Sequence, residues 1–142
     1  MATTRKAAAH WEGSLMEGKG EFSLNSSNLG TFPVTWAARS AEPNGVTSPE
    51  ELIAAAHSTC FSMALSHALA QAGHPATTVD TAAEVDFQPG TGITGIRLKV
   101  TGAVPGIDAT KFAEFAADAK ENCPVSQALK AVPISLETEF VA

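Results

Sequence analysis

Short apolar runs separated by Gly, Ser, Asn and Thr fill the first part of the chain, up to about residue 45. The runs at 7–11, 20–24 and 32–37 have the length of strands, and the Gly and Asn residues between them favour turns. The sequence EPNG at 42–45 is a further turn signal. This part of the chain is therefore predicted to form three short strands joined by turns.

A long helix is predicted to begin at Ser48. Ser48 can cap the helix, Pro49 suits the first helical position, and Glu51 completes a capping box three residues after Ser48. The helix is expected to end at Gly73, with Pro75 beyond it.

This helix is unusually apolar, because no Asp, Glu, Lys or Arg occurs from 52 to 72. A membrane span is one interpretation, but the stretch holds two His, three Ser, a Thr and a Gln, and much of the rest is Ala. These residues favour a helix that is buried nearly all round. A small domain cannot easily surround one helix, so we expect a partner subunit to cover part of it.

In the second half of the chain, the pattern of apolar residues and turn signals predicts strands followed by helices. Asp108 can cap a helix with an apolar stripe, and the sequence Asn-Cys-Pro at 122–124 ends it. Strands before helices indicate an α+β fold, which we expect to form a single domain over residues 1–142. The predicted elements are strands at 78–87 and 93–102, helices at 109–121 and 124–131, and a closing strand at 133–141.

Composition narrows the class of protein. The chain has 142 residues and a formal net charge of −6, which argues against nucleic acid or an anionic membrane as the main partner. The N-terminal sequence has no apolar core of signal-peptide length, so the expected location is the cytoplasm, where thiols stay reduced. The two cysteines are therefore expected to serve chemistry rather than to form a structural disulfide.

The two cysteines occupy different kinds of position. Cys123 precedes Pro124 at a helix start, where the helix dipole would favour its thiolate; a chance capping position is the alternative. Cys60 lies in the middle of the apolar helix, where a free cysteine is often only packed. They are too far apart for a CxxC motif, so only the fold can bring them together.

A metal site is an alternative use of these residues. His57 lies three residues before Cys60 and could act on it as a base or share a metal ion with it. Zinc needs about four ligands, and Cys123, His67 and His74 do not have ligand spacing. We therefore expect no metal, and we expect His57 to be a buried or interface residue.

Charged residues lie near the start of the apolar helix. Glu51 is explained by capping, which leaves Glu50 free for another role. Arg39 is an isolated arginine before the helix, for which a surface charge is the alternative; an Arg–carboxylate pair near a cysteine would stabilise its thiolate. Glu50 and Cys60 are ten residues apart, about 15 Å along a straight helix, so they cannot touch within it. If both serve one site, the helix bends or Glu50 comes from an antiparallel neighbour, which favours a dimer with composite sites.

Four stretches together resemble the OsmC/Ohr family of thiol-dependent peroxidases, and the similarity spans nearly the whole chain. They are SPEELIAAAHSTCFSMALS, ENCPVSQAL, WEGSLMEGKG and TWAARS. An Arg just before the long helix is similar to the OsmC branch more than to the Ohr branch. The residues at 36–38, before that Arg, depart mildly from the family pattern and remove no catalytic group.

The resemblance implies a role for four residues. Cys60 matches the peroxidatic cysteine, Cys123 the resolving cysteine, Arg39 the arginine that holds the thiolate, and Glu50 its carboxylate partner. It also implies an intertwined α+β homodimer in which antiparallel sheets surround two long central helices. No cofactor or metal is expected, and the expected reductant is a dithiol, for which lipoylated proteins are candidates.

The function implied by the resemblance is reduction of organic hydroperoxides, and more weakly of hydrogen peroxide, to alcohols in oxidative or osmotic stress defence. Cys60 would become a sulfenic acid and then a disulfide with Cys123, which a dithiol reduces. Two alternatives stay open: a redox sensor that uses the same disulfide as a switch, and a metal-binding protein. The residues Leu52, Ile53, Phe61 and Met63 could line an apolar pocket or belong to the core.

Overall fold

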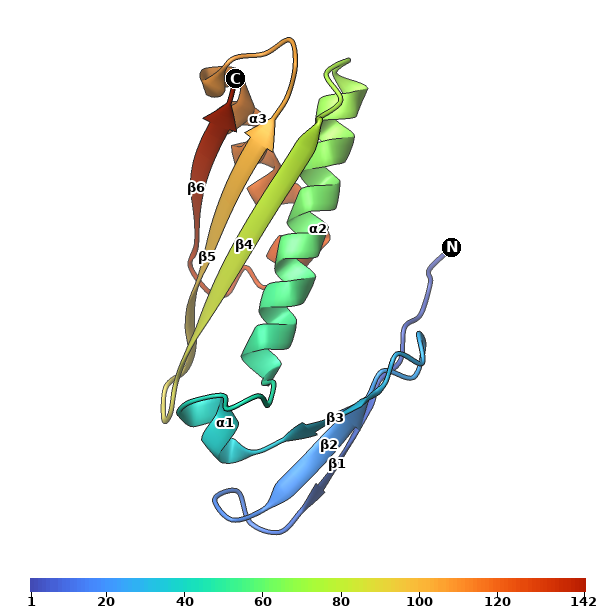
Figure 1. Cartoon of the computed structure of the whole chain (residues 1–142), viewed down its shortest axis with the longest axis vertical. Coiled ribbons are helices and arrows are strands. Elements are labelled where there is room, and N and C mark those ends of the chain that lie inside the picture. The colour runs from blue at the N-terminus through green and yellow to red at the C-terminus, as the bar shows by residue number, and fades with distance from the viewer. The chain divides into compact units, whose positions relative to one another are not determined.

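The computed structural model describes all 142 residues and divides into two compact units, Met1–Leu52 and Ile53–Ala142. Figure 1 shows the elements in chain order. The single domain expected from the sequence stays a prediction.

The first unit contains a small antiparallel sheet in the order β1-β2-β3, as the sequence predicts. The Trp11 indole lies against Gly20, where a Cβ atom would come within 2.5 Å of the ring, so the sheet depends on a residue without a side chain. The Phe22 and Phe32 rings pack across the sheet with centroids 5.4 Å apart. The strands are β1 (Ala8–Glu12), β2 (Lys19–Ser23) and β3 (Thr31–Val34).

The strand predicted at 32–37 is wrong in its second half. β3 ends at Val34, and the short helix α1 (Trp36–Ser40) follows. The cause is Thr35, whose hydroxyl accepts a hydrogen bond from the Ala38 N–H at 3.1 Å and so caps a helix. This turn of helix places Arg39 in its last turn.

The long helix α2 (Pro49–Gln71) begins where the sequence predicts. Ser48 Oγ accepts a hydrogen bond from the Glu51 N–H at 3.1 Å. The Glu51 carboxylate bonds the Thr47 hydroxyl rather than closing the capping box on Ser48. After α2 the chain turns at Gly73, which has a φ of +86° that other residues rarely adopt.

The second unit contains a three-stranded sheet in the order β4-β5-β6. β4 (Thr78–Gln88) and β5 (Gly92–Ala103) form the predicted antiparallel pair. β6 (Ile134–Val141) instead runs parallel to β5, so the expectation of purely antiparallel sheets is wrong for this pair. The reason is the helical connection between the two strands, which carries the chain back before it enters the sheet.

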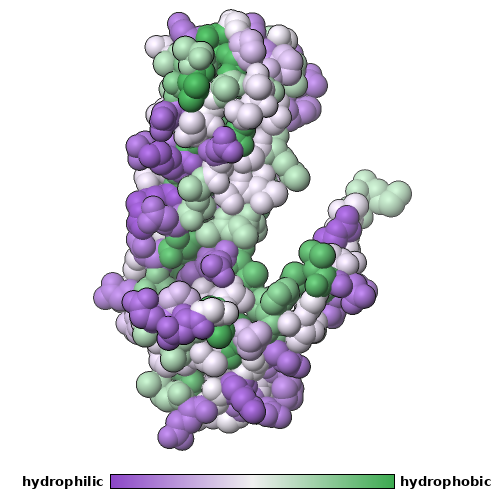
Figure 2. Space-filling view, in the orientation of Figure 1, coloured by the Kyte–Doolittle hydropathy of each residue, from purple (hydrophilic) through white to green (hydrophobic).

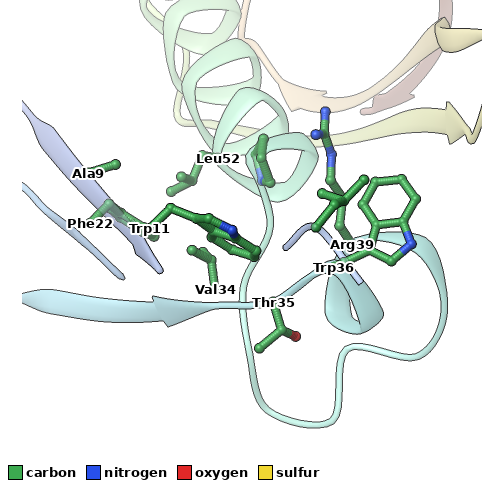
Figure 3. A pocket seen from close by; sticks show the side chains of 10 residues that line it. Ala9, Trp11, Phe22, Val34, Thr35, Trp36, Arg39 and Leu52 are labelled. Atoms are coloured by element: carbon green, nitrogen blue, oxygen red, sulfur yellow. The ribbon is translucent and has the colours of Figure 1, made fainter. Parts of the chain in front are cut away.

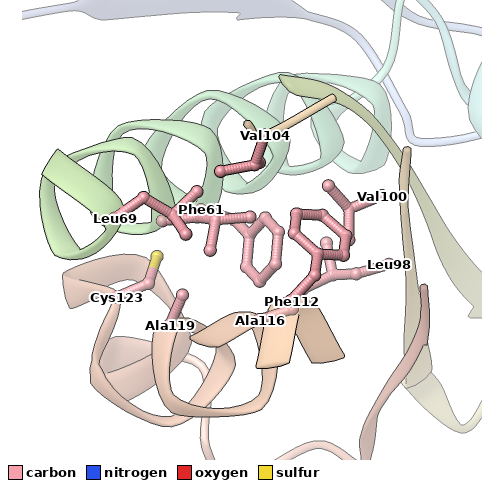
Figure 4. Close-up of a cluster of buried hydrophobic side chains, with 10 residues drawn as sticks. Phe61, Leu69, Leu98, Val100, Val104, Phe112, Ala116, Ala119 and Cys123 are labelled. Atoms are coloured by element: carbon pink, nitrogen blue, oxygen red, sulfur yellow. The ribbon is translucent and has the colours of Figure 1, made fainter. Parts of the chain in front are cut away.

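Helices cover one face of this sheet. The helical connection consists of α3 (Ala109–Asn122) and α4 (Pro124–Ala128), and Asp108 caps α3 as predicted. Figure 1 shows α2 running beside β4, and Figure 4 shows the core that α2, α3 and β5 share. The buried core side chains are Phe61, Leu65, Leu69, Leu98, Val100, Val104, Phe112, Ala116, Ala119 and Cys123.

One side of α2 remains exposed and carries no charged residue after Glu51. Its exposed positions include Ala55, Ala56, Met63 and Ala70, and Met63 is 68% exposed. Figure 2 shows the surface over α2 mainly in white and pale green, with few hydrophilic side chains. By length and composition alone, α2 is long and apolar enough to cross a membrane. The core helix of a soluble protein meets the same two criteria.

Candidate functional site

The structure brings the two cysteines into contact. Cys60, on α2, is half-buried, and Cys123, between α3 and α4, is fully buried. Cys60 packs against the buried cluster that includes Cys123, and the Cys123 thiol is near enough to raise the pKa of Cys60. Both cysteines are free thiols. Figure 4 shows the Cys123 sulfur directed from the turn between α3 and α4 toward α2. Two thiols held this near each other are candidates for a disulfide.

The backbone at the start of α4 acts on Cys60 rather than on Cys123. The sequence suggested that Cys123 would receive the N–H groups of α4, but its side chain makes no capping hydrogen bond. The Val125 N–H instead lies near Cys60 and lowers the pKa of its thiol. The start of α4 therefore favours a thiolate on the partially accessible cysteine.

Burial opposes that thiolate. Burial is the largest cause that raises the pKa of the Cys60 thiol above its usual value, and the hydrogen bond with Cys123 raises it further. The Val125 N–H lowers the Cys60 pKa but does not reverse the shift. Cys60 therefore needs an additional positive charge close to its sulfur to be a thiolate at neutral pH.

Arg39 and Glu50 form a bidentate ion pair in the first unit. Arg39 Nη2 and Nε both donate to Glu50 Oε1, at 2.8 and 3.0 Å, and Nε also lies 3.2 Å from Oε2. Glu50 is 6% exposed, whereas the Arg39 side chain is one-third exposed. The carboxylate therefore fixes one edge of a guanidinium that solvent can still reach.

An apolar cavity of about 490 Å³ lies in the first unit and includes Arg39 in its lining. Figure 3 shows side chains of the sheet and of the first turn of α2 around this space. Of the four apolar residues considered from the sequence, Leu52 lines this cavity, Phe61 belongs to the core, and Met63 is exposed. The lining residues are Ala9, Trp11, Leu15, Phe22, Val34, Thr35, Trp36, Arg39, Pro49 and Leu52.

His57 is fully buried, as the sequence suggested, but its partner was not predicted. His57 Nε2 and Ser126 Oγ are 2.7 Å apart and join α2 to α4. Burial lowers the pKa of His57 below its usual value, so the ring is neutral at neutral pH. A spacing could have revealed the pair, because His57 precedes Cys60 by three residues and Ser126 follows Cys123 by three.

The four predicted site residues thus form two pairs in different compact units: Arg39 with Glu50, and Cys60 with Cys123. No group of three or more His, Cys, Asp or Glu side chains is arranged to hold a metal ion. The chemistry that the second unit can offer is that of a thiol pair.

Comparison with known proteins identifies close relatives. A family model described as OsmC-like protein matches residues 42–138. The protein named Peroxiredoxin OsmC from Escherichia coli (strain K12) is 48% identical over 134 residues, which cover 92% of this chain and 93% of the relative. The protein of the same name from Shigella flexneri has the same identity and coverage.

Solved structures share the fold at lower identity. An organic hydroperoxide resistance protein OsmC from Legionella pneumophila has a TM-score of 0.71 and 21% identity, covering 100% of this chain and 99% of that one. The organic hydroperoxide resistance protein OhrB of Bacillus subtilis has a TM-score of 0.66 and 22% identity, with 98% of each chain covered.

Proposed function

Since this chain belongs to the OsmC-like family and is a cysteine-based peroxidase, we propose that it reduces organic hydroperoxides with Cys60 as the peroxidatic cysteine and Cys123 as the resolving one. The contact between a half-buried and a fully buried thiol carries this assignment. The half-buried thiol can meet a substrate, and the buried thiol is protected from it. The names of the relatives, peroxiredoxin and organic hydroperoxide resistance protein, support the choice of substrate.

The reaction proceeds in three steps. The Cys60 thiolate attacks the distal oxygen of the hydroperoxide, the O–O bond breaks, and an alcohol leaves after taking up a proton. The Cys60 sulfenic acid then condenses with the Cys123 thiol, forming the disulfide and releasing water. A dithiol reduces this disulfide by exchange and is itself oxidised to a disulfide.

Arg39 supplies the positive charge that Cys60 requires. The guanidinium favours the Cys60 thiolate and orients the peroxide, while Glu50 holds the guanidinium in place. This role is supported by the bidentate geometry of the pair and by the partial exposure of Arg39. Because Glu50 and Cys60 are ten residues apart on one helix, Arg39 and Glu50 of one subunit serve the cysteines of the other.

The functional unit is a homodimer. Its support is the exposed side of α2, where Ala55, Ala56 and Met63 would place apolar surface in water in a single chain. A second copy of the same helix offers the same apolar surface, so the two helices can cover each other. The intertwined arrangement implied by the family resemblance fits this requirement.

The apolar cavity in the first unit holds the hydrocarbon group of the substrate. Its volume of about 490 Å³ is in the range of small-molecule sites, and Arg39 is the charged group in its lining. An organic hydroperoxide has one apolar part and one polar end, which matches this lining. Hydrogen peroxide has no apolar part and is expected to be the weaker substrate.

The enzyme acts in the cytoplasm and draws electrons from a dithiol, with lipoylated proteins as candidates. A reducing compartment suits an enzyme whose Cys60–Cys123 disulfide has to be reduced again in every turnover. A dithiol is favoured over a monothiol as the reductant. Its first sulfur forms a mixed disulfide with the enzyme, and its second sulfur then attacks that bond intramolecularly and frees the enzyme thiol.

Steady-state turnover tests the proposal. Cumene hydroperoxide and hydrogen peroxide are supplied side by side, with dihydrolipoamide, dithiothreitol or glutathione as reductant. We expect multiple turnovers with both dithiols, a higher kcat/KM for cumene hydroperoxide, and little turnover with glutathione. The Cys123→Ser variant is expected to consume about one equivalent of peroxide in the absence of reductant. Wild-type protein that stops after one equivalent with every reductant would contradict a peroxidase and favour a redox sensor.

A further inference from the structure

The buried pair of His57 and Ser126 has no role in the reaction described above, although it lies beside both cysteines. His57 is one turn from Cys60 on α2, and Ser126 follows Cys123 by three residues on α4. Both are almost completely buried, and the two side chains bond at 2.7 Å. The pair therefore joins the helix that carries Cys60 to the segment that carries Cys123 and Val125.

The position of α4 depends on such contacts. A helix of five residues, Pro124–Ala128, is far too short to be stable alone. Its placement against α2 decides whether the Val125 N–H reaches the Cys60 sulfur and whether the Cys123 sulfur stays in contact with it. A shift of about 1 Å would lengthen a sulfur hydrogen bond enough to weaken it substantially.

His57 has one hydrogen bond through which it can act. Its Nδ1 atom is buried without a partner, so Nε2 is the ring atom that is engaged, and it contacts Ser126. A buried polar atom without a hydrogen-bond partner destabilises the fold. An apolar residue at position 57 would fill the same space without this loss of stability. The cost is consistent with a function for the Nε2 contact.

We propose that His57 and Ser126 form a clasp that positions α4, so that the Val125 N–H stays on the Cys60 sulfur and Cys123 stays ready to resolve it. Neither residue touches the peroxide, so both are positioning residues. The clasp has two effects: it favours the Cys60 thiolate, and it speeds condensation of the sulfenic acid with Cys123 relative to its further oxidation. This inference rests on the proposed function for its second effect only.

The test compares Ser126→Ala with Ser62→Ala, a matched control. Ser62 also makes a 2.7 Å hydroxyl contact from α2 to another element, to Thr81 on β4, and its other hydrogen bond, to the Ser58 carbonyl, stays within α2. The first readout is the pH profile of Cys60 alkylation by iodoacetamide in the reduced full-length protein, resolved from Cys123 by peptide mass mapping. We expect Ser126→Ala to move the alkylation midpoint upward and to slow alkylation at pH 7 about three- to tenfold.

The second readout is the fate of oxidised Cys60. Excess cumene hydroperoxide can oxidise the sulfenic acid to a sulfinic acid, releasing a second cumyl alcohol, before Cys123 attacks. Ser126→Ala is expected to accumulate more Cys60 sulfinic acid per turnover than the wild type. Ser62→Ala is expected to match the wild type in both readouts, and Ser126→Thr, which keeps the hydroxyl, to stay close to it.

A double variant separates positioning from stability. His57→Leu/Ser126→Ala removes both polar partners from the core, so it is expected to fold even if Ser126→Ala does not. The clasp predicts that the double variant keeps the slow alkylation and the excess sulfinic acid. Wild-type alkylation in the double variant, or equal rates in Ser126→Ala and Ser62→Ala, would overturn the clasp.

The two claims fail separately. Alkylation requires no peroxide, so a shifted profile in protein that cannot turn over peroxide would support the first effect and contradict the proposed function. Normal turnover with unshifted profiles would leave the proposed function intact and overturn the clasp.

Discussion

At the scale of single residues, Cys60 is under opposing influences. Burial and the neighbouring thiol raise its pKa, and a single backbone N–H lowers it. A peroxidatic cysteine reacts as the thiolate, so the protein has to offset that burial with charge. Arg39 is the residue that we assign to this task, and the assignment can be tested through the ionisation of Cys60 alone.

Replacing Arg39 with methionine keeps a long side chain and removes the charge. Loss of a nearby positive charge raises a thiol pKa by about one unit or more, so the thiolate fraction at pH 7 falls about tenfold. We expect the midpoint of Cys60 alkylation to move to higher pH and kcat/KM for cumene hydroperoxide to fall by a similar factor. Arg97→Met, which removes an exposed arginine paired with Asp86 and Glu84, is the control. Equal midpoints in the two variants would reject the assignment.

The neutral state of His57 makes the protein less stable in acid. Its pKa is lower in the folded chain than the usual 6.5, so below pH 6.5 the unfolded chain binds a proton that the folded chain does not. This contribution is full above about pH 6.5 and is lost as the pH falls toward the folded value. We expect the Tm difference between pH 7.5 and 5.5 to be smaller in His57→Gln than in the wild type.

The control for His57→Gln is His10→Gln, which changes an exposed histidine on β1. It is expected to keep the wild-type difference in Tm. A His57→Gln protein with the same pH dependence as the wild type would show that His57 does not limit stability in acid.

At the scale of elements, the fit between β5 and α3 is close. A Cβ atom at Gly102 would lie 2.3 Å from the ring of Phe112, which is fully buried and cannot move aside. Gly102→Ala is therefore expected to lower the free energy of unfolding by roughly 1–3 kcal/mol, measured by urea denaturation. Gly95→Ala, on the same strand with its nearest atom 3.8 Å away, should change it by less than about 0.5 kcal/mol. Equal losses in the two variants would contradict this packing.

Local signals predicted most of the elements. Ser48 and Asp108 start α2 and α3 as expected, because N-caps act within a few residues of themselves. The helix α1 was missed because Thr35 can sit in a strand as readily as cap a helix. The parallel pairing of β6 was missed because strand direction depends on how α3 and α4 return the chain.

The sequence supplied candidate site residues, but it could not supply their arrangement. The resemblance singled out Cys60, Cys123, Arg39 and Glu50, and the structure places them as two pairs. The contact between His57 and Ser126 spans 69 residues of sequence, and its only trace there is that each residue lies three positions from a cysteine. The Val125 N–H likewise reaches a sulfur on another helix.

At the scale of the whole molecule, the exposed side of α2 is the feature that requires a partner. Met63→Glu would bury an unpaired charge in the proposed interface, which costs more than about 1.4 kcal/mol and weakens self-association at least about tenfold. We expect sedimentation to show a shift from dimer to monomer and a parallel loss of turnover, since the composite site is lost. Ser135→Glu, at an exposed position of β6 paired with Arg97, is the control. A monomeric wild-type protein with full activity would contradict the dimer.

The central claim is that Cys60 meets the peroxide and Cys123 resolves it, and a single oxidation tests this most directly. The reduced protein is mixed with one equivalent of cumene hydroperoxide per chain, and the cysteines are then mapped by peptide mass analysis. The account predicts one cumyl alcohol per chain, a disulfide that joins Cys60 to Cys123, and no oxidation when Cys60 is replaced by serine. Sulfenic or sulfinic acid on Cys123 beside a reduced Cys60, or undiminished peroxide consumption by Cys60→Ser, would contradict it.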